Sequence, residues 1–158
     1  MQKITPFLWF NNNVEEAFNF YVSVFKNSRI VNVSRSGKGW PGEEGKVFTG
    51  TIEIEGQEFM ALNGGPMYKF TPAISFFVKC KTQEEVDDLW GKLSEGGTPQ
   101  QCGWLTDKFG VSWQVIPNAL GEYLGDKDPE KVKRVMNAMM QMVKIDVEGL
   151  KRAYEGEK

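Results

Sequence analysis

The sequence contains no histidine and only two cysteines, Cys80 and Cys102, among its 158 residues. The absence of histidine excludes Ser-His-Asp and Cys-His catalytic groups and every zinc site that uses histidine. Two cysteines are too few for a Cys₄ zinc site or for a scaffold held by disulfides, so we expect a reducing, cytoplasmic setting. The composition therefore predicts neither a structural zinc site nor a catalytic centre built on histidine.

Long apolar runs and an excess of basic charge are also missing. No stretch approaches the roughly 20 apolar residues of a membrane span, and the N-terminal segment does not have the pattern of a signal peptide. The net charge is −2, so we expect no surface for nucleic acid or for anionic lipid. Hydrophobic residues make up 41% of the chain and charged residues 25%, which is typical of a globular protein whose length suits one domain.

A helical pattern occurs twice in the chain. The segment NVEEAFNFY, which starts at Asn13, can be aligned with TQEEVDDLW, which starts at Thr82. Asn13 and Thr82 are residue types that cap helices, and Glu16 and Glu85 follow three residues later, as in a capping box or its close relative. Apolar side chains then recur at helical spacing in both segments. We therefore predict two equivalent helices in a repeated unit.

Strand-like segments surround each predicted helix. They cover residues 4–10, 29–35, 47–54 and 57–63 in the first half, and 73–78, 100–102, 104–106 and 111–116 in the second. The strand before each helix is apolar on both faces, which predicts that both faces are covered. Glu55-Gly56 and residues 107–110 have the composition of tight turns between strands. Each half therefore has the order βαβββ.

The predicted architecture is α+β, with two tandem βαβββ modules in a single domain that covers residues 1–158. Glycine and proline punctuate a linker between the modules, and Asp128 with Pro129 indicates the start of a helix in the tail. The predicted segments are the first module at 1–63, the linker at 64–72, the second module at 73–117 and a helical tail at 118–158.

Several stretches of the sequence resemble the PhnB-like family, which is labelled 3-demethylubiquinone-9 3-methyltransferase. They are LNGGPMYKFTPAISFFVKC, QEEVDDLWGKL, CGWLTDKFGVSWQVIP and the tail segment KVKRVMNAMMQMVKIDVEGLKRAY. That family is part of the vicinal oxygen chelate superfamily, which includes glyoxalases and bleomycin-resistance proteins. The resemblance implies that paired strands curl into a half-open barrel around a cavity, and that two copies of the chain form a homodimer.

The resemblance also implies where a metal of this superfamily would be bound, because each half supplies one ligand from its first strand and one from its last. These positions fall near Pro6, Ala61, Ala73 and Gln114, and a shift of the register by a residue or two brings in Asn63 and Ser75. Proline and alanine side chains have no lone pair, and a neutral amide is a poor ligand for zinc or nickel. We therefore predict a protein without a superfamily metal and without a cofactor.

Alternation of side chains along the strands selects the residues that line the predicted cavity. The lining is mostly apolar, with a few neutral polar groups, which is typical of a site for a small molecule. The predicted ligand-contacting residues are Leu8, Phe10, Phe59, Asn63, Ser75, Phe77, Trp104 and Gln114. Asn63 and Gln114 have two interpretations, since each amide either orients a ligand or is satisfied by neighbouring backbone. Trp104 likewise either packs in the core or reaches the mouth of the cavity.

Residues 37–42, GKGWPG, match the letters of a dinucleotide-binding fingerprint. That fingerprint requires a following helix, whereas an alternating strand pattern follows here, so we expect a loop between strands. Trp40 in this loop is a candidate lid over a pocket, with an exposed or locally packed side chain as the alternative.

Among the carboxylates near strand ends, including Asp107, the spacing selects no general base, and a solvated charge is the default expectation.

Three functions are compatible with these features. The first is metal-independent binding of a small, partly apolar molecule in the cavity. The second is an enzyme that uses acid and base groups without a metal, either the methyltransferase of the family label or a lyase or isomerase. The third is a dimeric structural partner with a vestigial cavity. The sequence favours the first, because it contains an apolar lining and no recognisable catalytic group.

Overall fold

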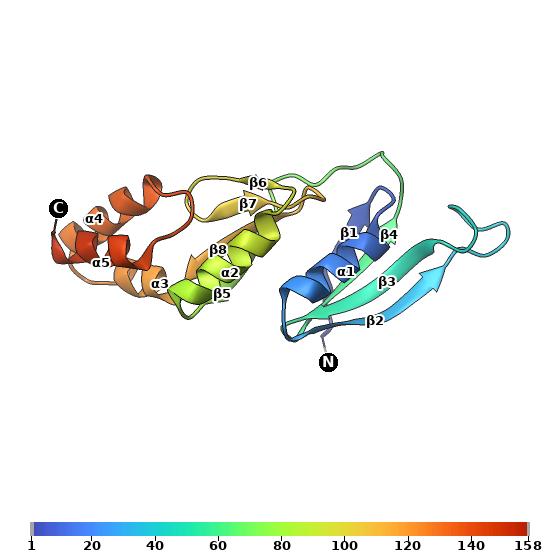
Figure 1. The fold of residues 1–158 in the computed structure, drawn as a ribbon, viewed down its shortest axis with the longest axis horizontal. Coiled ribbons are helices and arrows are strands. Elements are labelled where there is room, and N and C mark those ends of the chain that lie inside the picture. Colours follow the sequence, from blue (N-terminus) through green and yellow to red (C-terminus); the bar gives the residue numbers. More distant parts are fainter. Residues whose placement is uncertain (1, 158) are drawn as a thin grey trace. The chain divides into compact units, whose positions relative to one another are not determined.

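The structure is a computed structural model that describes residues 2–157, and it is a mixed α+β fold (Figure 1). The chain divides into two compact units between Phe70 and Thr71, within the predicted linker. Each unit contains one four-stranded sheet with a helix packed on it, and the second unit adds a helical tail. The predicted α+β class and the tandem βαβββ order are confirmed.

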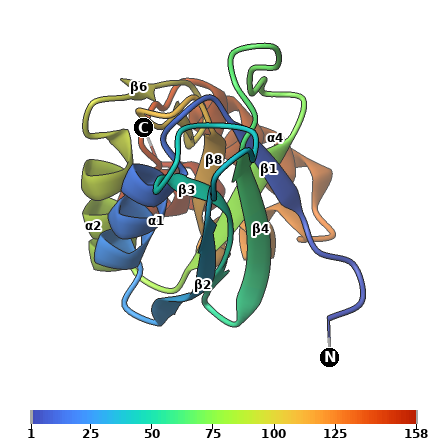
Figure 2. The same ribbon diagram turned by 90° about the vertical axis from the view of Figure 1, so that its right-hand side faces the viewer.

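The first unit contains one helix between its first and second strands. Its elements are β1 (Phe7–Phe10), α1 (Val14–Val24), β2 (Ser28–Arg35), β3 (Val47–Ile54) and β4 (Gln57–Asn63). The sheet order is β1-β4-β3-β2, and only β1 and β4 are parallel, as their adjacent ribbons in Figure 2 show. Glu55 and Gly56 join β3 to β4 with φ of 51° and 81°, as a two-residue hairpin turn requires.

The start of α1 differs from the prediction. The side chain of Asn13 makes no capping hydrogen bond. Asn63, at the end of β4, replaces it, because its Oδ1 accepts a hydrogen bond from the Val14 N–H at 3.0 Å. The Nδ2 of the same side chain donates to the Val47 carbonyl at 2.8 Å. One of the first unpaired N–H groups of the helix is therefore satisfied by a residue 49 positions away, which a local motif cannot reveal.

The core of the first unit lies between α1 and the sheet. Phe18 on the buried face of α1 lies directly over Gly50 of β3. A Cβ at position 50 would lie 2.8 Å from the Phe18 ring and 3.0 Å from the Asn32 carbonyl oxygen. Glycine at this position therefore allows the helix to approach the sheet closely enough to bury its apolar stripe.

The second unit repeats the same arrangement, with shorter counterparts of β2, β3 and β4. Its elements are β5 (Ser75–Cys80), α2 (Gln83–Ser94), β6 (Thr98–Pro99), β7 (Trp104–Thr106) and β8 (Ser112–Pro117), in the sheet order β5-β8-β7-β6. Thr82 caps α2 as predicted, since its side chain accepts a hydrogen bond from the Glu85 N–H at 3.2 Å. The prediction for β6 was wrong, because Cys102 and Gly103 have φ of 60° and 81° and form a turn where a strand was expected.

A helical tail follows β8 and consists of α3 (Asn118–Leu124), α4 (Pro129–Met140) and α5 (Val147–Glu155). Asp128 and Pro129 start α4 as predicted, and the Asp128 side chain accepts a hydrogen bond from the Glu130 N–H at 3.0 Å. The short α3 was not predicted, because it begins without a side-chain cap. The tail packs on the end of β8 through a core formed by Ile116, Leu120, Val135, Ile145 and Leu150. Within residues 2–157, no helix combines the length and apolar character of a membrane span.

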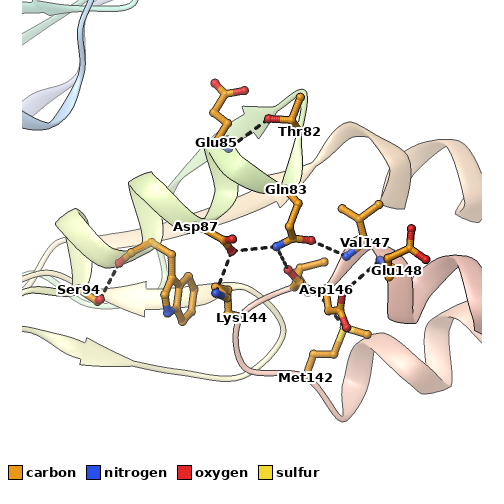
Figure 3. Close-up of polar contacts among 12 residues, drawn as sticks. Thr82, Gln83, Glu85, Asp87, Ser94, Met142, Lys144, Asp146, Val147 and Glu148 are labelled. Atoms are coloured by element: carbon orange, nitrogen blue, oxygen red, sulfur yellow. Dashed lines mark hydrogen bonds and ion pairs between the residues drawn. The ribbon is translucent and has the colours of Figure 1, made fainter.

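The segment between α4 and α5 is tied to α2 through the side chain of Gln83 (Figure 3). Gln83 donates to the Ile145 carbonyl and to Asp87, both at 3.0 Å, and accepts from the Val147 N–H at 2.7 Å. Lys144 forms an ion pair with Asp87 at 2.8 Å. Hydrogen bonding first to Lys144 and then to Gln83 lowers the pKa of Asp87. This contribution to stability is therefore present at neutral pH and is lost as the pH falls through that lowered pKa.

Asp107 connects the turn between β7 and β8 to the core, although a solvated charge was expected at this position. Its side chain is only 3% exposed. One oxygen accepts from the N–H groups of Phe109 and Val111 at 2.8 and 3.0 Å, and the other accepts from the Trp113 indole N–H at 2.9 Å. Asp107 is therefore a structural residue that fixes both the turn and the orientation of Trp113.

We predict that Asp107→Ala destabilises the protein by about 3 kcal/mol or more, because it removes a buried acceptor from three donors. Chemical denaturation monitored by circular dichroism measures the loss. Asp88→Ala is the matched control, since the Asp88 carboxylate pairs with Lys92 on the surface at 3.0 Å and such pairs contribute about 1 kcal/mol or less. Equal losses for the two variants would contradict the role of Asp107.

We also predict that Gln83→Ala loosens the tail without unfolding the sheet. The Val147 N–H loses its acceptor, so its hydrogen exchange is expected to accelerate by roughly tenfold, equivalent to about 1.4 kcal/mol. Native-state hydrogen exchange followed by NMR provides the measurement. Gln141→Ala, an exposed change at the end of α4, is the control. Unchanged exchange at residues 145–147 in the Gln83 variant would argue against this anchor.

Candidate functional site

In the second unit, α2 packs on one face of the sheet and the opposite face carries a row of predicted site residues. Leu105, Trp113 and Val115 are buried on the helix side. The strand register places Phe77 beside Gln114, and Gln114 beside Trp104, on three adjacent strands. Because paired residues of neighbouring strands point to the same face, these three side chains form one continuous row away from α2.

A second row lies next to the first, with Ser75 paired to Ser112 and Ser112 paired to Thr106. We call Ser75, Phe77, Trp104 and Gln114 the open face of the second unit. Gln114 is half-buried, and its Nε2 donates to the Ser75 Oγ at 2.9 Å. Phe77 beside it is 54% exposed. The open face therefore offers an oriented amide between two aromatic rings.

The chemistry of the open face suits recognition of a small molecule. In the described part of the chain no hydrogen bond is recorded for the Oε1 of Gln114, which leaves an acceptor next to the flanking rings. An amide also has a second N–H to donate. Aromatic rings supply a large apolar contact surface at small entropic cost. Such a surface can orient a carbonyl or amide group while an apolar part of the same molecule packs on the rings.

In the first unit the predicted residues Leu8, Phe10, Phe59 and Asn63 lie on the face that α1 covers. Phe10 and Phe59 are buried, and Asn63 makes the two backbone hydrogen bonds described above. The uncovered face instead carries residues that the sequence analysis did not select. They are Phe7, Trp9, Met60 and Leu62, which pair across β1 and β4.

The difference between the two units has a simple geometric cause. Three residues, 11–13, separate β1 from α1, whereas two residues, 81–82, separate β5 from α2. A shift of one residue moves every side chain of a strand to the other face, so one alternation pattern cannot be transferred between the modules. The last strand residue before the helix is buried in both units, namely Phe10 in β1 and Cys80 in β5. Counting back from this apolar residue would have identified the strand face that the helix covers.

Residues 36–46 form a loop, and several of them line a half-open pocket of about 390 Å³ together with residues at the ends of β1 and β4. We call it the loop pocket. Ser36 holds the loop together, because its Oγ donates to the Pro41 carbonyl at 2.7 Å and its N–H donates to the Lys46 carbonyl at 2.8 Å. The predicted lid residue Trp40 belongs to this loop, is 53% exposed, and lies edge-on to Phe48 with ring centroids 6.4 Å apart. Strand β3 follows the loop, which supports its interpretation as a connection between strands.

The described residues contain few groups with perturbed chemistry. Burial, followed by the nearby Glu85 carboxylate, raises the pKa of the Cys80 thiol to about 12, so a thiolate nucleophile is not available there at neutral pH. Within residues 2–157, no three His, Cys, Asp or Glu side chains gather as a metal site would require. Ala61, one of the expected superfamily positions, is buried on the face that α1 covers, and the uncovered face of the first unit carries Phe7, Trp9, Met60 and Leu62. None of these side chains is an oxygen or imidazole ligand, so the residues present do not fit such a metal.

Comparison with known proteins connects this geometry to a family. The model of the 3-demethylubiquinone-9 3-methyltransferase family matches residues 2–116, a range that ends before α3. A solved structure described as a putative 3-demethylubiquinone-9 3-methyltransferase, PhnB protein, from Bacillus cereus is 43% identical, with a TM-score of 0.69, over 73% of this chain and 99% of that chain. A comparison with curated proteins finds no match.

More distant structures show the same fold. Protein PA1353 from Pseudomonas aeruginosa is 24% identical, with a TM-score of 0.63, over 74% of this chain and 98% of that chain. The fosfomycin resistance protein FosX from Listeria monocytogenes, solved with Mn(II) and sulfate, is 13% identical, with a TM-score of 0.51, over 72% of this chain and 89% of that chain. These two structures therefore share the fold of this chain.

We predict that Cys80 resists alkylation by iodoacetamide at pH 8 in the folded protein, because almost none of its thiol is ionised and the side chain is buried. Mass spectrometry of tryptic peptides measures the modification. The same thiol in protein unfolded by guanidinium is the control and is expected to react fully. Rapid labelling of Cys80 in the native protein would contradict its assignment as a core residue.

Proposed function

We propose that this chain, which belongs to the 3-demethylubiquinone-9 3-methyltransferase family, binds a small, partly apolar molecule on the open face of its second unit without the help of a metal ion. The observation that carries the proposal is the row Phe77–Gln114–Trp104, in which an amide held by Ser75 lies between two aromatic side chains. Few convergent polar groups in apolar surroundings are typical of small-molecule sites.

Gln114 is the orienting group in this proposal. Its bond to Ser75 restricts rotation of the amide, so a ligand does not have to immobilise it on binding. The carbonyl oxygen of the ligand then accepts from the second N–H of Gln114, an amide N–H of the ligand donates to the Oε1 of Gln114, and its apolar part packs on Phe77 and Trp104. The ligand class that follows is a ring compound with an amide or carbonyl group.

The absence of donor side chains at the superfamily positions supports metal independence. The uncovered face of β1 and β4 carries Phe7, Trp9, Met60 and Leu62, none of which is an oxygen or imidazole ligand. On the open face, the neutral amide of Gln114 is a poor ligand for zinc or nickel. FosX was solved in complex with Mn(II), but FosX shares only the fold with this chain. Treatment with EDTA is therefore expected to leave binding unchanged.

The family description favours one alternative, an enzyme that transfers a methyl group. S-adenosylmethionine is the methyl donor that this alternative requires, and isothermal calorimetry with that compound separates the two functions. Saturable heat at micromolar to millimolar concentrations that free adenine does not reproduce would support a methyltransferase. Absence of heat, together with binding of an aromatic amide, supports the binding protein.

We predict that benzamide, which combines a ring with a carboxamide, binds to EDTA-treated protein and shifts the NMR signals of Gln114 and Trp104. Gln114→Ala is expected to weaken this binding about three- to tenfold, equivalent to roughly 0.5–1.5 kcal/mol for one hydrogen bond. Gln141→Ala, at an exposed position in the tail, is the control and should not change the affinity.

A second variant, Ser75→Ala, separates loss of the Gln114 amide from loss of its orientation. Ser75→Ala leaves Gln114 in place but removes its hydrogen-bond partner, so a smaller loss of benzamide affinity is expected than for Gln114→Ala. Binding that depends on added Mn²⁺ or Zn²⁺, or that is unchanged in the Gln114 variant, would contradict the proposed function.

A further inference from the structure

We propose that the loop pocket of the first unit is a binding site for a neutral, planar ring compound that has a hydrogen-bond donor and an acceptor side by side, the chemistry of a nucleobase. This inference goes beyond the proposed function, because all residues that line the pocket belong to the first unit. The two sites can therefore be tested, and can fail, independently of each other.

The pocket lies where two parallel strands end together. Chain segments leave β1 at Asn11 and β4 at Gly64, and both segments line the pocket. Backbone pairing continues beyond the strands, since the Gly64 N–H donates to the Phe10 carbonyl at 2.9 Å and the Gly65 N–H donates to the Asn11 carbonyl at 3.1 Å. With the Ser36–Pro41 bond across the third wall, these hydrogen bonds hold the backbone of the pocket in place before a ligand arrives.

Trp9 is a rigid aromatic wall of the pocket. Its indole N–H donates to the Gly65 carbonyl at 3.0 Å, and its ring contacts Tyr68 edge-on with centroids 5.0 Å apart. A Cβ at position 64 would lie 2.3 Å from the indole ring, so only glycine leaves room for this orientation. With Phe48 and Leu62 beside it, the indole provides a fixed apolar surface against which a planar ring can pack.

Two neighbouring asparagines, Asn11 and Asn12, line the same pocket. The side chains of Asn11 and Asn12 are exposed, and no hydrogen bond to either is recorded within residues 2–157. Asn63 also lines the pocket, but both ends of its amide are already used by backbone groups. Each free carboxamide has a donor and an acceptor side by side, the arrangement that reads the paired donor and acceptor of an adenine edge.

The charges at the rim favour a neutral ligand. Glu43 and Lys46 both line the pocket and form an ion pair at 2.9 Å. A ligand with one net charge would be attracted by one member of the pair and repelled by the other, whereas a neutral ring is not penalised. The volume of about 390 Å³ is within the range of small-molecule sites and accommodates a purine.

Adenine is the probe that tests the site, added to the full-length ¹⁵N-labelled protein and followed by NMR. The expected result is a saturable shift of the Trp9 indole N–H and of the Asn11 and Asn12 side-chain amides. The double variant Asn11→Ala/Asn12→Ala is expected to bind adenine at least about tenfold more weakly, because two bidentate contacts are lost. Asn27→Ala, at an exposed asparagine outside the pocket, is the control and should bind as the parent chain does.

Indole serves as a matched probe, since it is planar but has a donor and no adjacent acceptor, and it is expected to bind more weakly than adenine. Gly64→Ala displaces the Trp9 ring and is expected to abolish the adenine shifts while the rest of the spectrum stays dispersed. The proposal is overturned if adenine causes no saturable shift at millimolar concentration, if the double variant binds like the control, or if indole and adenine bind equally well.

Discussion

Packing of one helix against one face of each sheet is the constraint on which the structure depends. Because strand side chains alternate between two faces, α1 and α2 each cover the side chains on one face of their sheet. In the second unit the opposite face includes Phe77, Trp104 and Gln114. In the first unit it includes Phe7, which is 51% exposed. The apolar character of β1 and β5 on both faces predicts two covered faces, and within each unit the helix covers one of them.

The same constraint explains which parts of the fold could be predicted from the sequence. Helices α1 and α2 and the hairpin at Glu55-Gly56 follow from local spacing and turn chemistry, and they were found. The Thr82 cap is also local, because donor and acceptor are three residues apart. The Asn63 cap of α1 was missed because its two partners, Val14 and Val47, are distant in the sequence.

Prediction of the candidate site from the sequence also depended on local features. The open face of the second unit was identified because the alternation from Ser75 to Phe77 and at Gln114 has the correct phase relative to α2. In the first unit one additional loop residue before α1 reverses the phase, so Phe10 and Phe59 lie in the core. Which face of a strand the helix covers can be read only from the number of residues between the last buried strand residue and the start of the helix. Amino-acid composition does not reveal it.

Structural polar residues in this protein use their hydrogen-bonding groups within the fold, whereas a candidate functional residue keeps a donor or acceptor for another molecule. Asp107 and Trp113 bind to each other at 2.9 Å inside the core, and Asn63 uses its amide to join a helix to a strand. Gln114 is chemically similar to Asn63, but it bonds to a side chain on its own face and keeps an acceptor for another molecule. Buried polar groups are generally paired, so an oriented amide with remaining capacity beside exposed rings is the more informative feature.

Chemical-shift mapping with a library of small aromatic amides and carbonyl compounds, on protein stripped of metals by EDTA, tests the central claim most directly. The account predicts that shifts concentrate on Ser75, Phe77, Trp104 and Gln114 of the second sheet and do not require a divalent cation. Shifts confined to the face covered by α2, or shifts that occur only after a divalent cation is restored, would contradict it.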